Sequence, residues 1–269
     1  MDEETAKKFA EIELRLTSIS NQLELERQKT FQLMSAVVSN FDLKIVEANS
    51  PLSSIAPIEV SPGGVNAPIL VFPSLVQSLG LPTPEFYRMS ARYGQTVYFI
   101  KDHAQCWYQR GLIGLSHNIP GTVEVFKEIL GESLPGLRTF GASAGGFAAI
   151  LFGVMLQARK IVAFSPQTLL TARNITRFKS QDTRSGDVLH GTYLDLVPVI
   201  EQSQDCEIHI HYGIGYAEDA KAAERLRGLP NTVLHAHDFN GHNVAGWLKK
   251  NNKLDEALAP IFEGANVLA

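Results

Sequence analysis

The sequence has little of several features that would assign a protein to a compartment or a partner at once. Its 269 residues include only two cysteines, carry a net charge of −4 and contain no apolar run long enough to span a bilayer. Two cysteines cannot form a disulfide framework, and the acidic balance gives no electrostatic footprint for nucleic acid. The first residues, Met1–Glu4, are acidic and do not resemble a secretory signal. We therefore expect a cytoplasmic protein with no nucleic-acid partner, no transmembrane segment, and Cys106 and Cys206 as reduced thiols.

Glycine and proline are absent from the first 50 residues, and this region differs in kind from the rest. Its apolar residues recur at alternating spacings of three and four: Phe9, Ile12, Leu16, Ile19, Leu23, Leu33 and Val37. Such a narrow stripe is typical of a coiled coil, although Glu26 and Thr30 weaken it. We expect residues 1–40 to form an amphipathic helix that makes a homo-oligomer through residues 9–37. The alternatives are a helix that lies on the following domain and a fragment of a longer protein whose helix continues upstream.

From residue 41 onward, short apolar segments alternate with segments of helical period. The expected strands cover residues 43–48, 54–60, 68–72, 96–100, 137–140, 160–165, 207–211 and 232–236. The expected helices cover residues 84–89, 122–130, 143–156, 193–202, 217–227 and 242–250. After residue 66 the alternation is strict, which is typical of a doubly wound, mostly parallel sheet with helices on both faces. The sequence therefore predicts an α/β domain over residues 41–269, with ligands bound at the carboxyl ends of its strands.

A polar stretch, residues 166–191, has no clear period and could form a cap over that end of the sheet. It contains four cations that could contact an anionic substrate: Arg173, Arg177, Lys179 and Arg184. A solvated charged loop is the alternative interpretation.

A glycine-rich pentapeptide, Gly141–Gly145, carries the strongest chemical signal. It has the pattern Gly-x-Ser-x-Gly and lies between the expected strand 137–140 and an expected helix. In this context the pattern indicates a nucleophile elbow, a sharp turn that exposes the serine hydroxyl. Ser143 is therefore the predicted nucleophile. The alternative is a strand–helix turn that is rich in glycine only for close packing.

A serine hydroxyl needs a neighbouring base, which should be a histidine after a late strand. His242 follows Asn240-Gly241 and precedes the last expected helix, so we predict it as the base. His237 lies in the same loop and is the competing choice.

An acid that orients the histidine should lie between the serine and the histidine in the chain. The loop after the strand 207–211 contains Asp219 and Glu218. We predict Asp219 as the acid, with Glu218 as the second choice. Both could instead be ordinary acidic residues at the start of a helix.

Two backbone amides should form an oxyanion hole beside the serine. The amide of Ala144, at the start of a helix, is one candidate. The second should follow the strand 68–72, where Pro73 has no N–H, so that Ser74 or Leu75 must supply it.

One further loop could contact a substrate. It places Trp107, Tyr108 and Arg110 together after the strand 96–100, and large aromatic side chains beside a cation suit sugar or acyl recognition. A packed loop that covers the edge of the sheet is the alternative.

From residue 41 onward the chain resembles the α/β-hydrolase fold family. The motifs that carry the likeness are Trp107–Gly111, Gly141–Gly146, Ala163–Gln167 and Gly241–Val244, and they look like those of a bacterial branch that includes glycan-modifying enzymes and capsule O-acetyltransferases. One position departs from the family, because many members place the acid where this chain has Tyr216.

The resemblance implies a serine esterase or O-acyltransferase that acts on a carbohydrate or another small ester. Ser143, Asp219 and His242 would form its triad, and no metal or organic cofactor would be required. The alternative function is a hydrolase-like interaction module without turnover, assembled through its N-terminal helix. Two observations favour this alternative: the coiled-coil stripe, and an acid that lies later in the chain than in many family members.

Overall fold

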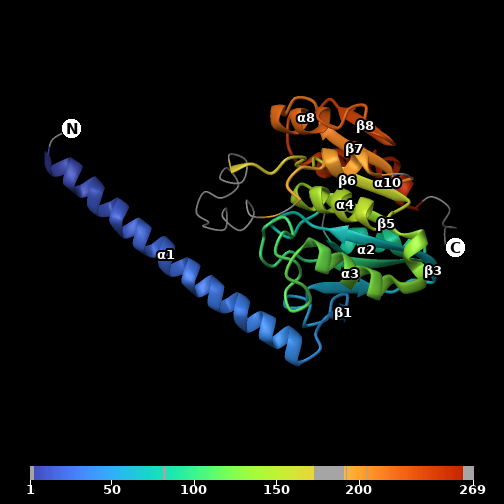
Figure 1. The fold of residues 1–269 in the computed structure, drawn as a ribbon. Helices are drawn as coiled ribbons and strands as arrows, with labels where there is room; N and C mark the ends of the chain where they lie inside the picture. Colours follow the sequence, from blue (N-terminus) through green and yellow to red (C-terminus); the bar gives the residue numbers. More distant parts are fainter. Residues whose placement is uncertain (1–2, 81–82, 173–190, 192, 204, 263–269) are drawn as a thin grey trace.

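The computed structural model describes residues 3–80, 83–172, 191, 193–203 and 205–262 (Figure 1). Most of the predicted cap, including Arg173, Arg177, Lys179 and Arg184, lies outside these residues.

Eight strands form one sheet at the centre of the domain. In chain order they are β1 (Ile45–Glu47), β2 (Ile58–Ser61), β3 (Val65–Phe72), β4 (Gln95–Ile100), β5 (Arg138–Ala142), β6 (Lys160–Phe164), β7 (Glu207–Gly213) and β8 (Thr232–His237). Their order across the sheet is β1-β2-β4-β3-β5-β6-β7-β8. The strands β3 to β8 are mutually parallel, and β2 pairs with β4 in the antiparallel sense. The prediction of a mostly parallel α/β sheet is confirmed.

Helices cover both faces of this sheet. One face carries α3 (Ile119–Leu130), α4 (Ala144–Met155), α7 (Val197–Glu201) and α8 (Ala217–Glu224), and the other carries α2 (Thr83–Arg92), α9 (Val244–Lys250) and α10 (Leu254–Phe262). A short 3₁₀ segment, η1 (Gly131–Gly136), joins α3 to β5. Successive residues of β3 point to opposite faces, so that Leu70 and Phe72 pack in one core and Ile69 and Val71 in the other.

The prediction that the helix near residue 250 is the last one is wrong, because α10 follows it. This helix contains Pro260, which normally ends a helix because it lacks an N–H and clashes with the preceding turn. The buried side chains of Leu258 and Ile261 pack against the sheet core and stabilise the helix nonetheless.

The N-terminal segment is one long helix, α1 (Glu3–Asn40), that projects away from the domain (Figure 1). Only its C-terminal part touches the domain: Val38 is fully buried, and Phe31 packs against the core. The large apolar side chains from Phe9 to Leu25, and that of Leu33, are more than half exposed. In this structure the helix therefore contacts the domain only near its C-terminal end.

None of the described helices has the length and apolar character needed to cross a membrane. Cys106 and Cys206 are both buried free thiols.

Candidate active site

Ser143 occupies a sharp turn between β5 and α4. Its backbone has φ 57° and ψ −119°, a conformation that residues with a Cβ rarely adopt. The Ser143 amide donates a hydrogen bond of 2.8 Å to the carbonyl of Phe164 at the end of β6. The turn is thereby fixed to the neighbouring strand, and the hydroxyl stands at the carboxyl edge of the sheet.

Two glycines make this turn possible. A Cβ on Gly145 would overlap the carbonyl of Phe72, and a Cβ on Gly141 would overlap the carbonyl of Gly145. The backbones of β3, β5 and the first turn of α4 therefore meet at distances that only glycine permits. The glycines of this motif serve close packing, and the same turn presents the partly exposed Ser143.

His242 lies between β8 and α9 and faces the serine. Its Nε2 is 2.9 Å from Ser143 Oγ, and its Nδ1 is 2.9 Å from both carboxylate oxygens of Asp219. Asp219 lies in the first turn of α8 and is only 6% exposed. Three strand ends thus bring a hydroxyl, an imidazole and a carboxylate into one hydrogen-bonded chain.

The competing acid and base do not join this chain. Glu218 is exposed beside Asp219. His237 is 3.1 Å from His211 through their ring nitrogens and packs against Trp247. Tyr216, at the position where many hydrolases carry the acid, packs its ring 5.9 Å from that of His242.

Four histidines stack on one face of β7 and β8, outside the hydrogen-bonded chain of the serine. Rings pack between His209 and His235, between His211 and His235 and between His211 and His237. Burial, with repulsion from the neighbouring histidines, lowers the pKa of His211 to about 2. Burial is also the main cause that lowers the pKa values of His235 and His237.

The predicted oxyanion donors differ in whether their amides already donate a hydrogen bond within the protein. The Ala144 amide belongs to the first turn of α4, where backbone N–H groups have no partner within the helix. The Ser74 amide donates to the Ser78 carbonyl at 2.8 Å. Among the described residues, the Leu75 amide has no such partner, and Gln105 Nε2 fixes the Leu75 carbonyl at 2.7 Å. Leu75 is therefore the better candidate of the two.

The side chains of Trp107, Tyr108 and Arg110 do not form one surface. Tyr108 is 1% exposed and donates to the Ile100 carbonyl at 2.8 Å, which leaves it no surface for a substrate. Arg110 is exposed and lies over the ring of Phe31, 5.3 Å from its centroid. The buried loop alternative therefore describes the two aromatic residues, and the cation points to α1.

Asp102 holds this loop in shape. Its carboxylate accepts hydrogen bonds from the amides of Cys106 and Tyr108, at 2.7 and 3.0 Å. Burial raises the pKa of Asp102 to about 6, although the backbone donors act in the opposite direction. Trp107 and Tyr108 both have positive φ, at 54° and 61°, so this turn is locally strained.

A residue that sequence reasoning missed also reaches the serine. Gln167 Nε2 is 3.2 Å from Ser143 Oγ, and Gln167 Oε1 accepts from Trp107 Nε1 at 3.1 Å. The sequence offers two signals for it: its place after the strand that ends near Ser165, and its position at the end of the motif Ala163–Gln167.

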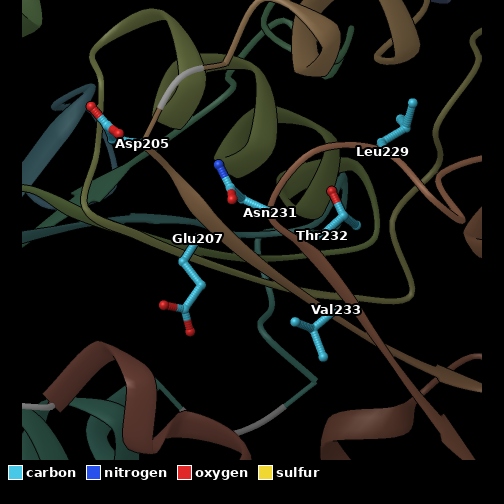
Figure 2. A pocket seen from close by; sticks show the side chains of 6 residues that line it. All are labelled: Asp205, Glu207, Leu229, Asn231, Thr232 and Val233. Atoms are coloured by element: carbon cyan, nitrogen blue, oxygen red, sulfur yellow. The ribbon is translucent and has the colours of Figure 1, made fainter.

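A hollow of about 490 Å³ lies away from these residues. Figure 2 shows the side chains that line it. Residues at the start of β7 and β8, including Glu207 and Thr232, line it. It therefore opens at the opposite end of the parallel sheet from Ser143. In the part of the chain that the structure describes, no cluster of histidine, cysteine, aspartate and glutamate is arranged to hold a metal ion.

No protein-family model and no curated protein sequence matches the chain. Solved structures do match it. A capsule O-acetyltransferase of Neisseria meningitidis serogroup A aligns with a TM-score of 0.51 at 16% identity, over 74% of this chain and 90% of that one. The fluorophosphonate-binding serine hydrolase FphF of Staphylococcus aureus aligns with a TM-score of 0.55 at 15% identity, over 77% and 92%.

A third match is a 2,6-dihydroxy-pseudo-oxynicotine hydrolase, with a TM-score of 0.56 at 14% identity, over 79% of this chain and 65% of that one. At such identities the likeness establishes the architecture and no more. Together with the strand order, the turn at Ser143 and the parallel sheet, it shows that the described residues after α1 have the α/β-hydrolase fold.

Proposed function

We propose that the protein is a serine-dependent esterase or O-acyltransferase that works through a covalent seryl ester. The observation that carries this proposal is the hydrogen-bonded chain from Ser143 Oγ through His242 to Asp219. A hydroxyl is a weak nucleophile, and an imidazole at 2.9 Å is within the distance at which it can take up the proton.

In the first half-reaction Ser143 Oγ attacks the ester carbonyl carbon while its proton passes to His242 Nε2. The carbonyl oxygen becomes an oxyanion, which the amides of Ala144 and Leu75 would stabilise. His242 then returns the proton to the departing alcohol oxygen as the C–O bond breaks. Asp219 keeps the imidazole in the correct tautomer and stabilises its charged form.

In the second half-reaction another hydroxyl attacks the carbonyl carbon of the seryl ester, and His242 takes its proton. His242 then returns this proton to Ser143 Oγ as the bond between Oγ and the acyl carbon breaks. Water as the acceptor releases a carboxylic acid, whereas a sugar hydroxyl yields a new ester. The similarity to a capsule O-acetyltransferase supports a carbohydrate acceptor, and the similarity to FphF supports hydrolysis. Rates with acetyl and longer acyl p-nitrophenyl esters, with and without sugar acceptors, would separate the two.

One of the two observations that favoured an interaction module no longer favours it. It depended partly on the displaced acid, and Asp219 bonds to the imidazole from the later position. The remaining motive is the exposed stripe of α1, which supports homo-oligomerisation through residues 9–37 but does not argue against catalysis. We keep the cytoplasm as the proposed location.

Fluorophosphonate labelling tests the enzyme proposal directly, because this reagent forms a bond only with an activated serine. We expect the wild type to be labelled and Ser143→Ala to remain unlabelled. His242→Ala should lose at least about a hundredfold in labelling rate, since general-base catalysis contributes that much. His237→Ala is the matched control and should stay within a factor of about three. Folded wild-type protein that resists labelling would overturn the proposal.

A further inference from the structure

We propose that Gln167 is a positioning residue that holds the Ser143 hydroxyl, and that Trp107 fixes which end of the Gln167 amide faces it. This inference rests on the proposed serine chemistry. Gln167 follows β6, whereas Trp107 belongs to the loop after β4, so two distant segments converge on the nucleophile.

The direction of the Gln167 amide follows from chemistry as well as from geometry. An indole N–H can only donate, and Trp107 Nε1 lies 3.1 Å from Gln167 Oε1. The carbonyl end of the amide must therefore face Trp107, which leaves the NH₂ end for Ser143 Oγ at 3.2 Å. Trp107 is 1% exposed and Gln167 is 8% exposed, so water competes little for either group.

The backbone around Gln167 is held on both sides. The Ser165 amide donates to the His211 carbonyl at 2.8 Å, and Ser165 has a positive φ of 45°. On the other side, the Thr168 hydroxyl donates to the Ala222 carbonyl at 2.8 Å. A side chain fixed in this way keeps its donor in place without having to be ordered when a substrate arrives.

The consequence for catalysis concerns the hydroxyl proton. When Ser143 Oγ accepts a hydrogen bond from Gln167, its own proton is directed to His242 Nε2 at 2.9 Å. As this proton leaves, negative charge grows on Oγ, and the same amide N–H stabilises it. Gln167 therefore acts on the formation of the seryl ester, and Trp107 acts only through Gln167.

Two substitutions test the arrangement. Gln167→Met keeps the approximate volume but removes the donor, and Trp107→Phe keeps an aromatic ring but removes the indole N–H. We expect Gln167→Met to lower the fluorophosphonate labelling rate about tenfold to a hundredfold. Trp107→Phe should lower it less, about threefold to tenfold, because the freed amide can still present its NH₂ end part of the time.

The double variant, Gln167→Met with Trp107→Phe, distinguishes a positioning role from a packing role. If Trp107 acts through Gln167, the double variant should label as slowly as Gln167→Met alone. With p-nitrophenyl acetate, Gln167→Met should lower kcat with little change in KM. Gln109→Met is the matched control, because Gln109 is buried in the same loop as Trp107 but donates to the Tyr193 carbonyl. It should label at nearly the wild-type rate, even where its melting temperature falls as much.

The inference is overturned if Gln167→Met labels like the wild type, if Gln109→Met slows labelling equally, or if the two single losses multiply in the double variant. A wild-type protein that does not label would instead overturn the proposed function, and the inference with it. The two failures are therefore distinguishable in one set of measurements.

Discussion

The helices α4 and α1 use apolar residues in opposite ways. From Ala144 to Val154 every residue of α4 is buried, because β3, β5 and β6 lie beside it. The longer α1 instead keeps its apolar residues in a narrow stripe, most of it exposed. A helix that is apolar on all sides has its partners within its own domain, whereas a narrow stripe indicates a partner helix.

The difference extends to function. Ser143 directly precedes the first turn of α4, and the packing of this helix fixes the position of the serine. The polar side chains of α1 pair with one another on its surface, as Lys8 does with Glu4 and Arg15 with Glu11. Exposed pairs of this kind contribute little to stability, so α1 can change its neighbours at small cost.

The largest effect is expected where α4 packs most tightly. In Gly145→Ala the added methyl group would overlap the carbonyl of Phe72, so β3 and the elbow must separate. We expect a loss of about 3 kcal/mol in the free energy of unfolding and loss of fluorophosphonate labelling. Thermal melting and labelling of the same sample would measure both.

Gly64→Ala is the matched control, because a Cβ there meets nothing within 4 Å. It should change stability by less than about 0.5 kcal/mol and leave labelling unchanged. If Gly145→Ala and Gly64→Ala changed stability and labelling to a similar extent, α4 would not be the rigid helix that its comparison with α1 assumes.

As the pH falls, we expect the domain that contains the sheet to lose stability before α1 does. The pKa of His211 is lowered to about 2 by burial and by the neighbouring histidines, while its ordinary value is 6.5. Below pH 6.5 the unfolded chain therefore binds a proton that the folded chain does not, and stability falls as the pH falls. The pKa values of His235 and His237 are also lowered, although Glu256 acts in the opposite direction and Lys253 in the same one.

His211→Gln should remove this acid sensitivity. One such histidine contributes a loss of about 2 kcal/mol between pH 6.5 and pH 5, so the variant should lose less stability on acidification than the wild type. Denaturant unfolding at pH 7, 6 and 5 measures the difference. His117→Gln, at an exposed histidine, should follow the wild type. Parallel pH curves for wild type and His211→Gln would contradict the expectation.

The residues around Ser143 show what a sequence can predict. The strand order places the ends of β5, β7 and β8 at one edge, so the motif at Ser143, the loop of Asp219 and the loop of His242 must converge there. Topology and chemical type thus predict these three residues, and the structure brings them together.

The same edge also shows where this reasoning fails. Trp107 and Tyr108 follow β4, as a substrate-binding loop would, but positive φ values turn their side chains into the core. No periodic pattern encodes such a turn. Gln167 and Trp107 both lie in motifs that the sequence shows, but their contact joins segments 60 residues apart, and neither motif indicates that the two side chains meet beside Ser143.

The stripe of α1 should break at a single position if it pairs with a second copy. Leu16→Glu places a charge within the stripe, and we expect at least a tenfold weaker dimer, which corresponds to about 1.4 kcal/mol. Leu14→Glu is the matched control, because Leu14 is also exposed but points away from the stripe. Light scattering over a range of concentrations measures both, and residues 40–269 give the reference for a protein without α1. A full-length protein that has the same state of association as this shortened one would contradict self-association through α1.

The smallest effect is expected at the joint between the two regions. Arg110 lies over the ring of Phe31, so it links the loop after β4 to the C-terminal part of α1. A cation over an aromatic ring at an exposed site contributes about 0.5–1 kcal/mol, and we expect the loss of this contact in Arg110→Ala to cost about that much. Because the guanidinium points to α1, KM for p-nitrophenyl acetate should stay within a factor of about two.

Phe31→Leu also loses packing against the core, so it should lose at least as much free energy as Arg110→Ala, and the double variant should lose no more than Phe31→Leu alone. A KM that rises tenfold in Arg110→Ala but not in Phe31→Leu would instead assign Arg110 to substrate recognition, as the sequence first indicated. Arg110 would then serve the active site and not the attachment of α1. In that case α1 would be attached to the domain mainly through the buried side chain of Val38.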